Sequence, residues 1–340
     1  MKNSPKISIA MPTYNVGKYI ADAIESIISQ TYIHWELIIV DDCSTDNTIA
    51  IIEKYLKTNK KITLIKREKN SGGCRLPRFD AILAAKGDFV CPIDSDDTIE
   101  KRYLEKLIKR QEETSADIVL SRIVYCDESQ KPKGTTIPDK SYNMDIISCG
   151  IDICKETIGE WRISMNGLIA KKTLYQNYIK QEYYSDFNKS FADEIDHRKV
   201  LISTNSISMV DAHYFYRQQP NSIIHTTSVN YYDLLIANKI LLDFIITTYK
   251  DDRELLHRMY DEYIEKVYRS QQKYYTYIKQ YSAKERKHIK SLIKESYSFI
   301  KKYELEFSTT RNKILSTSYT LFKLYAWIVI FIVKIKLLFK

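Results

Sequence analysis

The chain has 340 residues, enough for a full catalytic domain and an additional segment. Hydrophobic residues make up 44% of the sequence and charged residues 28%, a composition that excludes an intrinsically disordered protein. The formal net charge is +9, and the six cysteines are scattered without a CxxC pair, so we expect free thiols in a reducing compartment and neither a disulfide framework nor a zinc site.

The first quarter of the chain alternates strand and helix patterns. Apolar runs typical of strands lie at residues 6–11, 37–40, 62–65 and 89–93, and segments with helical spacing separate them. Pro12 is expected to end the first strand. This order predicts an α/β layer fold with a mostly parallel central sheet and right-handed crossovers.

Polar residues follow three of these predicted strands. They are Pro12 to Asn15, Asp41 with Asp42, and Asp94 to Asp97. In open parallel sheets, ligands bind beyond the carboxyl ends of the strands. We therefore expect three clusters that are far apart in sequence to converge on one crevice.

The run FVCPIDSDD, residues 89–97, ends in three carboxylates within four positions. Along an extended chain, Asp94 and Asp96 would point to one side and Ser95 to the other. Two carboxylates facing one point suit Mg²⁺ or Mn²⁺, which keep water ligands and bind substrate phosphates. The alternative is a solvated acidic turn that caps the helix expected from about Lys101.

Several motifs in this region together resemble a known family. The runs SIAMPTYN, ELIIVDDCSTDNT, NSGGCRLPR and AKGDFVCPIDSDD are similar to the nucleotide-binding half of a family 2, GT-A fold glycosyltransferase of the bacterial surface-polysaccharide type. The resemblance covers about the first 100 residues and continues more weakly to Arg217. GxGxxG and Walker motifs are missing, which argues against dinucleotide and P-loop readings.

The resemblance implies a binding site for a nucleotide sugar. It puts Pro12, Thr13, Tyr14 and Asn15 beside the base and ribose, where a tyrosine ring can stack on the base. Asp42 matches the acidic residue that accepts a hydrogen bond from the base. A carboxylate suits the N3–H of uracil, so a UDP-sugar is favoured. Asp41 remains open as the residue that points in, since neighbouring strand residues face opposite ways.

Residues farther along the chain are expected to bind the diphosphate and the metal. By resemblance, Arg78 lies near the diphosphate, although this chain lacks the usual Ala-Arg-Asn triplet, and Arg75 is the alternative. The resemblance also implies that Asp94, Ser95 and Asp96 contact the nucleotide sugar. Asp94 and Asp96 would hold Mn²⁺ or Mg²⁺.

The segment SFADEIDHR, residues 190–198, resembles the part of the family that carries the catalytic base. The family usually has Glu-Asp here, whereas this chain has Ala192 followed by Asp193. We assign the base role to Asp193 by resemblance, because an inverting transfer needs one carboxylate that takes a proton from the acceptor hydroxyl. Glu194 and Asp196 are alternatives. Asp193 could instead only cap the helix that follows.

Three other segments bear on the acceptor. Residues 127–140 have the composition of a mobile loop, expected near the acceptor side. Trp161 is either a platform for a sugar ring or a core tryptophan. The segment YFYRQQPNSI lacks the QxxRW form of processive synthases, which favours an enzyme that adds a single sugar.

The remainder of the chain, from about residue 226, shows helical spacing. Residues 253–340 contain 19 Lys and Arg against 8 Asp and Glu, so the basic excess belongs to this tail. About 20 apolar residues are needed to cross a bilayer, whereas the run AWIVIFIV, residues 326–333, is flanked by lysines, so a marginal membrane span is only a lesser alternative. We expect a terminal helix, at about 316–340, that lies on an anionic membrane surface. Packing on the protein or on a second protomer is the alternative.

These patterns predict a catalytic domain at residues 1–225 and a helical extension at 226–340. The function expected by resemblance is inverting, metal-dependent transfer of a sugar from a nucleotide sugar to a glycan or lipid-linked acceptor. Met1 to Lys6 is polar, so no signal peptide is expected, and the enzyme would be cytoplasmic at the inner face of the cell membrane, without nucleic acid as a partner. The alternatives are a nonenzymatic membrane- or nucleic-acid-binding module and a nucleotidyltransferase of nucleotide-sugar synthesis.

Overall fold

The structure is a computed structural model that describes residues 4–159, 168–182, 187–219, 226–302 and 318–338, with side chains described as far as Phe331. The chain divides into two compact units. Unit 1 comprises Met1–Lys189 and Asp196–Pro220, and unit 2 comprises Ser190–Ile195 and Asn221–Lys340. The division into domains 1–225 and 226–340 remains a prediction.

The described residues of unit 1 form one ten-stranded sheet with the order β3-β2-β1-β4-β9-β6-β10-β5, while β7 pairs with β6 and β8 with β10. The β3, β2, β1 and β4 strands are parallel, as the alternating pattern predicted. The strands are β1 (Ile7–Thr13), β2 (Trp35–Asp41), β3 (Ile62–Lys66), β4 (Phe89–Pro92), β5 (Thr98–Ile99), β6 (Ile118–Cys126), β7 (Pro132–Ile137), β8 (Ile147–Ser148), β9 (Leu168–Lys171) and β10 (Ile207–Arg217).

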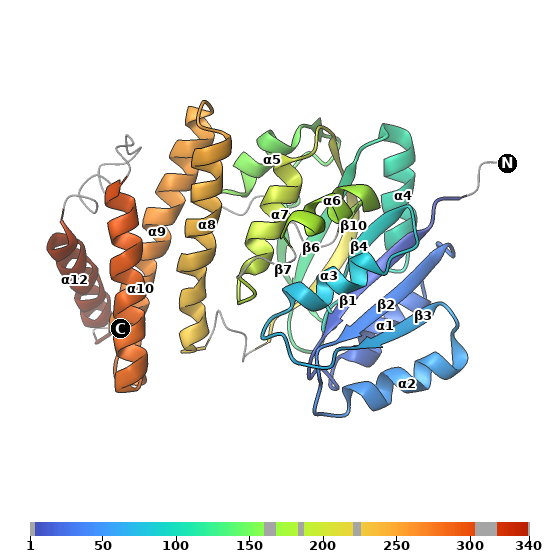
Figure 1. Cartoon of the computed structure of the whole chain (residues 1–340), viewed down its shortest axis with the longest axis horizontal. Helices are drawn as coiled ribbons and strands as arrows, with labels where there is room; N and C mark the ends of the chain where they lie inside the picture. Colours follow the sequence, from blue (N-terminus) through green and yellow to red (C-terminus); the bar gives the residue numbers. More distant parts are fainter. Residues whose placement is uncertain (1–3, 160–167, 183–186, 220–225, 303–317, 339–340) are drawn as a thin grey trace. The chain divides into compact units, whose positions relative to one another are not determined.

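Helices cover both faces of this sheet (Figure 1). Alternate residues of β1 pack into two different cores, because successive side chains of a strand face opposite ways: Ile9 joins one core and Ala10 the other. The first core includes residues of α1 (Ile20–Ile28), α2 (Thr48–Thr58) and α4 (Tyr103–Thr114). The second includes residues of α3 (Arg75–Leu83), α5 (Gly150–Thr157), α6 (Lys172–Glu182) and α7 (Ala192–Ile202).

Two local predictions were wrong. Residues 127–140 were expected to be a mobile loop, but they contain β7, whose backbone pairs antiparallel with β6. The polar composition predicted a loop because most side chains of β7 are exposed. Such a strand does not show the alternation of apolar and polar residues that marks a half-buried strand. Pro12 does not end β1, since the strand continues to Thr13 and Pro12 pairs in register with Val40 of β2.

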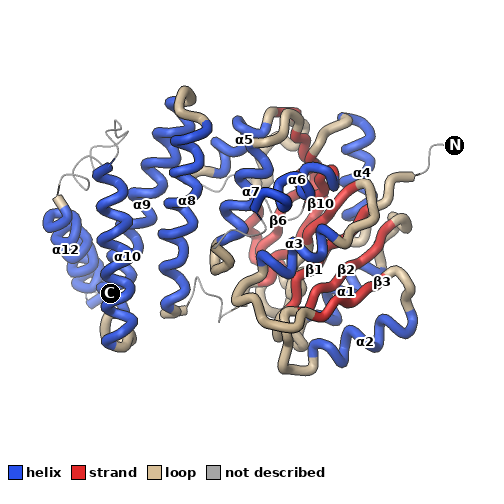
Figure 2. Tube along the Cα trace, viewed as in Figure 1, coloured by secondary structure: helices blue, strands red, loops and turns tan. Residues whose placement is uncertain are grey.

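The described part of unit 2 consists of helices, apart from connecting turns (Figure 2). They are η1 (Val229–Tyr232), α8 (Asp233–Thr248), α9 (Arg253–Tyr277), α10 (Ala283–Lys302) and α12 (Tyr319–Leu338), and the first turn of α7 also belongs to this unit. Tyrosines fill much of the interior: Tyr260, Tyr263 and Tyr274 are each at most 1% exposed. The Tyr232 and Tyr281 hydroxyls lie 3.3 Å apart, which gives these buried polar groups a partner.

Helix α12 has a packed side and an exposed apolar side. Phe322 and Ala326 are buried, and the Phe322 ring lies against those of Tyr268 and Tyr297. On the exposed side, Trp327 and Phe331 are half exposed and their rings stack. Among the described residues, no helix is both long enough and apolar enough to cross a membrane.

Candidate active site

The three polar clusters predicted from sequence do converge. Strand β1 lies between β2 and β4, and all three run in the same direction. Thr13 pairs with Asp41, and the Asp42 amide donates to the Thr13 carbonyl at 2.9 Å. The Ile93 amide donates to the Ala10 carbonyl at 3.1 Å, so Asp94 emerges at the same edge.

Residues Asp94 to Asp97 form a turn and not the extended continuation that was expected. Strand β4 ends at Pro92, and the Asp97 amide donates to the Asp94 carbonyl at 3.2 Å. Burial nevertheless alternates as predicted: Ser95 and Asp97 are buried, whereas Asp94 and Asp96 are half-buried. Asp94 and Asp96 therefore both reach solvent in part, whereas Ser95 and Asp97 lie inside the protein.

The carboxylates of this turn interact electrostatically. Burial, followed by the negative charge of Asp94, raises the pKa of Asp96 to about 6. Burial likewise raises the pKa of Asp97 well above its usual range, although Asp97 accepts hydrogen bonds from the Tyr214 hydroxyl at 2.8 Å and the Arg217 amide at 2.7 Å. Negative charge is thus concentrated where water is partly excluded, which disfavours the charged forms.

This donor set fits a divalent cation. A cation beside Asp94 and Asp96 would offset both the loss of solvation and the repulsion between their charges. No group of three or more His, Cys, Asp or Glu side chains within the described ranges could hold a metal. Two carboxylates leave the other coordination positions to water and phosphate oxygens, as Mg²⁺ and Mn²⁺ commonly require.

The two arginines near the start of α3 have different surroundings. Arg78 Nη2 lies 2.9 Å from Asp94 Oδ1, at the rim of the carboxylate turn. Arg75 is 2% exposed, and its Nε donates at 2.9 Å to both carboxylate oxygens of the buried Asp196. Arg75 was the alternative diphosphate ligand, and that alternative is wrong because its guanidinium is committed to an internal ion pair.

The Asp42 carboxylate is buried and holds the loop before α3. It accepts from the Ser71 amide at 2.9 Å and from the Ser71 hydroxyl at 2.9 Å, and Arg67 Nε lies 3.2 Å from it. The neighbouring Asp41 accepts from the Ser44 amide at 2.9 Å through Oδ2, while its buried Oδ1 has no hydrogen-bond partner among the described residues. Both carboxylates flank the end of β1, so either of them could accept the hydrogen bond from the nucleobase of the donor.

The segment after β1 presents an aromatic ring to solvent. Tyr14 is 49% exposed, which excludes the alternative that it is a core aromatic and leaves its ring available for stacking. Asn15 has φ +49°, and its Oδ1 accepts from the Thr45 amide at 2.8 Å. The Ser44 hydroxyl accepts from the Asn15 amide at 2.9 Å. These contacts tie the Tyr14 turn to the residues after β2.

The candidate base and its alternatives lie on α7. Asp193 and Glu194 are in its first turn, within unit 2, and Asp196 is in unit 1. Burial raises the pKa of Asp196 despite the opposing interaction with Arg75, and Asp196 also accepts from the Tyr178 hydroxyl at 2.5 Å. An acid held by two internal donors cannot readily take a proton from a substrate, so Asp196 is a poor candidate. Trp161 lies outside the described residues.

Two residues at the end of β10 that the sequence did not single out, Arg217 and Gln219, contact Asp96. Gln219 Nε2 donates to Asp96 Oδ2 at 2.5 Å, and Arg217 Nε donates to the Asp96 carbonyl at 2.8 Å. Arg217 also pairs with Asp22 at 2.9 Å. From the sequence, the motif YFYRQQ indicates only that the processive QxxRW form is missing. The available signal was an arginine at the end of a strand pattern, since a charge that a strand carries into the protein needs carboxylate or carbonyl partners.

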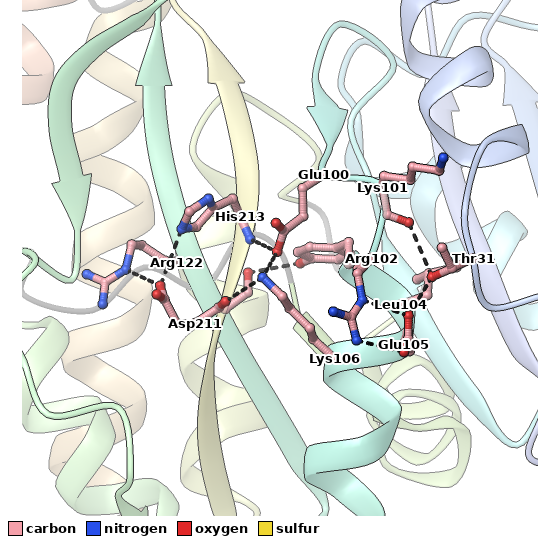
Figure 3. Close-up of polar contacts among 12 residues, drawn as sticks. Thr31, Glu100, Lys101, Arg102, Leu104, Glu105, Lys106, Arg122, Asp211 and His213 are labelled. Atoms are coloured by element: carbon pink, nitrogen blue, oxygen red, sulfur yellow. Dashed lines mark hydrogen bonds and ion pairs between the residues drawn. The ribbon is translucent and has the colours of Figure 1, made fainter.

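A polar network fixes the middle of β10 (Figure 3). The pairing of β10 with β6 shifts register between Met209 and His213. Around this irregularity, Arg122 Nε lies 2.7 Å from Asp211 Oδ1, and the His213 amide donates to Glu100 at 2.9 Å. Lys106 Nζ contacts the Glu100 carboxylate at 2.5 Å. The network supports the strand that delivers Arg217 to the carboxylate turn.

Comparison with known proteins identifies the family of the N-terminal half of the chain. The model of the family described as "Glycosyl transferase family 2" matches residues 8–178. The glycosyltransferase GlyG of Streptococcus pneumoniae serotype 4 is 28% identical over 226 residues, covering 66% of this chain and 74% of GlyG. The poly(ribitol-phosphate) beta-N-acetylglucosaminyltransferase TarS of Staphylococcus aureus is 30% identical over 271 residues, covering 74% of this chain but only 44% of TarS.

A solved structure shares the fold. The crystal structure of S. aureus TarS residues 1–349 in complex with UDP-GlcNAc superposes with a TM-score of 0.62 at 21% identity, covering 86% of this chain and 91% of that one. At this level of identity, the likeness supports a GT-A-like fold: a mixed α/β architecture with a mostly parallel central sheet and C-terminal helices.

Proposed function

The chain belongs to glycosyl transferase family 2 and is a glycosyltransferase, and from this premise we propose that it transfers a sugar from a UDP-sugar to a hydroxyl of a cell-surface glycan or lipid-linked saccharide, with inversion at the anomeric carbon. One observation carries the proposal. The ends of β1, β2 and β4 bring Tyr14, Asp42, Asp94 and Asp96 to one edge of the sheet, with Arg78 bound to Asp94.

We assign the donor as follows. The exposed Tyr14 ring stacks on the base, and a carboxylate of the Asp41–Asp42 pair accepts its N3–H, which favours uracil. Arg78 binds the diphosphate. Asp94 and Asp96 would hold Mn²⁺ or Mg²⁺, which when bound would supply positive charge to stabilise the leaving diphosphate. Arg217 and Gln219 keep Asp96 in place.

We assign the base role to Asp193. Its carboxylate takes the proton of the acceptor hydroxyl while that oxygen forms a bond to the anomeric carbon, and the bond from that carbon to the diphosphate breaks with its electron pair leaving on UDP. Asp193 has no hydrogen bond or ion pair with another described residue, whereas Glu194 Oε2 accepts from Asn238 Nδ2 at 3.3 Å. Within the described residues, the Asp193 carboxylate is thus less engaged than that of Glu194, which favours Asp193 as the proton acceptor.

We further propose that the protein works at the cytoplasmic face of the cell membrane, with α12 lying on anionic lipid. The support is its exposed apolar side, with Leu321 48%, Leu324 49% and Trp327 51% exposed, within the strongly basic segment 253–340. A second protomer covering this side is the alternative. The tail's basic residues serve lipid in this proposal and not nucleic acid.

Calorimetry with UDP and Mn²⁺ tests the donor site. Asp96→Ala should nearly abolish metal-dependent UDP binding while leaving the fold intact, because removing a carboxylate that Asp94 repels relieves an unfavourable interaction. Asp145→Ala is the control: that carboxylate is 88% exposed and pairs only loosely with Arg110, at 3.4 Å. Unchanged metal-dependent binding by Asp96→Ala would sink the assignment.

A further inference from the structure

An aromatic and cationic cluster lies within unit 2, outside the donor site. Phe191, two residues before Asp193, packs edge-on against Tyr231 of η1, with ring centroids 6.3 Å apart and planes at 90°. Lys273 of α9 places its Nζ 3.7 Å from the centroid of the Tyr231 ring. Three segments that are far apart in sequence therefore meet next to the residue proposed as the base.

The backbone of Phe191 is strained. Its φ is +66°, in the left-handed region that side-chain-bearing residues rarely adopt. The Glu194 amide donates to the Phe191 carbonyl at 3.2 Å, so this residue sets how α7 begins. Strained backbone persists where surrounding contacts fix it, and such strain is concentrated at binding and catalytic sites.

Two cations of α9 act on the same tyrosine. Lys273 is half-buried, and burial lowers its pKa. Arg269 lies four residues earlier, one helical turn away, and its charge acts to lower the pKa of Tyr231, which burial raises. Glu194 also acts electrostatically on Tyr231, which brings the first turn of α7 into the same neighbourhood.

We propose that Phe191, Tyr231, Lys273 and Arg269 form the acceptor subsite, and that it takes a sugar or polyol chain bearing anionic groups. The aromatic rings contact the carbon skeleton of a sugar or polyol unit, and the two cations bind a phosphodiester or carboxylate on the chain. Asp193 then receives the proton of a hydroxyl on that chain. The inference rests on the proposed function, because it uses Asp193 as the base.

The charge of the subsite decides which acceptors bind. A neutral polyol can accept hydrogen bonds from the two cations, whereas an anionic one also gains the direct attraction between opposite charges. Phosphate and carboxylate share this chemistry. Ribitol 5-phosphate and glucuronate therefore serve as the two anionic probes, with ribitol as the neutral comparison.

The subsite is tested by measuring how the three probes bind to the full chain, with saturation-transfer NMR and calorimetry. The wild-type protein should bind at least one anionic probe at least tenfold more tightly than ribitol. Lys273→Gln should reduce that binding about tenfold or more, and Arg269→Gln should reduce it less because Arg269 is more exposed and also pairs with Glu265 at 2.8 Å. Lys294→Gln, which removes an exposed lysine of α10 elsewhere in the unit, should leave it unchanged.

Metal-dependent UDP binding, measured on the same samples, separates this inference from the proposed function. If wild-type protein binds UDP with Mn²⁺ but no anionic probe better than ribitol, or if Lys273→Gln and Arg269→Gln bind the probes as well as wild type does, the subsite is wrong and the donor assignment stands. If UDP binding itself is absent, the proposed function fails. Because Arg269 is exposed, its variant keeps the test valid even if Lys273→Gln does not fold.

Discussion

The two units hold their candidate functional residues in different ways. In unit 1, the carboxylates follow parallel strands whose backbone hydrogen bonds fix the register, as in the pairing of Thr13 with Asp41. In unit 2, the proposed base and acceptor residues come from a helix start, a short 3₁₀ helix and a long helix, and side-chain contacts alone hold them together. A sheet edge tolerates little change without losing its hydrogen bonds, whereas side chains between helices can be exchanged singly.

Substitutions in the two units should therefore differ in how they change turnover and donor affinity. Substitution of the proposed base, Asp193, should have the largest effect. Asp193→Asn keeps the shape of the side chain but cannot take up a proton, so turnover should fall by about 10² to 10⁴ while affinity for the UDP-sugar holds. Asp96→Ala should impair donor binding as well as rate. Turnover and donor affinity are to be measured on the same preparations.

Glu194→Gln is the matched control for this prediction. Its carboxylate is one residue away and already accepts from Asn238, so this variant should keep near-normal turnover. Near-normal turnover in Asp193→Asn together with collapse in Glu194→Gln would transfer the base role to Glu194.

A second prediction separates structure from binding inside unit 1. Arg75→Met leaves the buried Asp196 without its cationic partner and with only the Tyr178 hydroxyl as a donor, and breaking a buried ion pair in this way costs about 3–5 kcal/mol of unfolding free energy. Arg78→Met should cost much less stability, because its partner Asp94 is 32% exposed, but it should weaken UDP binding about tenfold or more. Urea unfolding and calorimetry of both variants check this. Equal losses of stability would contradict the distinction between the two arginines.

A third prediction concerns α12 in unit 2. Replacing Trp327 and Phe331 together by serine should weaken binding to anionic vesicles at least tenfold, since each buried aromatic contributes about 1.5–3 kcal/mol. Ile33→Ser, which removes an apolar side chain that is 63% exposed in unit 1, is the control and should sediment with vesicles as wild type does. Sedimentation velocity of the same samples tests the alternative of a second protomer. Vesicle binding that survives the double substitution would place the anchor elsewhere.

The smallest effect is expected at Asp211, in the network of Figure 3. Burial acts to raise the pKa of Asp211, but the hydrogen bond and charge of Arg122 lower it below its usual value. A lowered pKa contributes stability above the unfolded-state pKa of about 3.9, and that contribution is lost as pH falls through the folded-state pKa. Asp211→Asn should thus cost at most about 0.5 kcal/mol at pH 7, because the side chain is 62% exposed, and the difference should shrink toward pH 3. Urea unfolding across this range measures it.

The sequence predicted unit 1 well where local pattern determines structure. Apolar runs located β1 to β4, and the rule for parallel sheets brought Asp42 and Asp94 to one edge. It could not predict that Arg75 pairs with Asp196, because 121 residues separate them and only tertiary packing joins them. The same limit hid the contact of Gln219 with Asp96 and the meeting of Phe191, Tyr231 and Lys273. Strand β7 was missed because an edge strand can be polar on both faces.

Helix α7 carries two carboxylates with different assignments only three residues apart. Asp196 anchors Arg75 inside the protein, and Asp193 is the proposed base. Residues at this spacing lie on neighbouring positions of one helix face, so a shift of the anchor turns the base as well. An engineer who replaced the buried ion pair by apolar side chains to gain heat resistance, as is often successful, would here alter turnover at the same time. Substitutions of the Arg75–Asp196 pair should therefore change heat resistance and turnover together, so the two properties should be hard to improve separately.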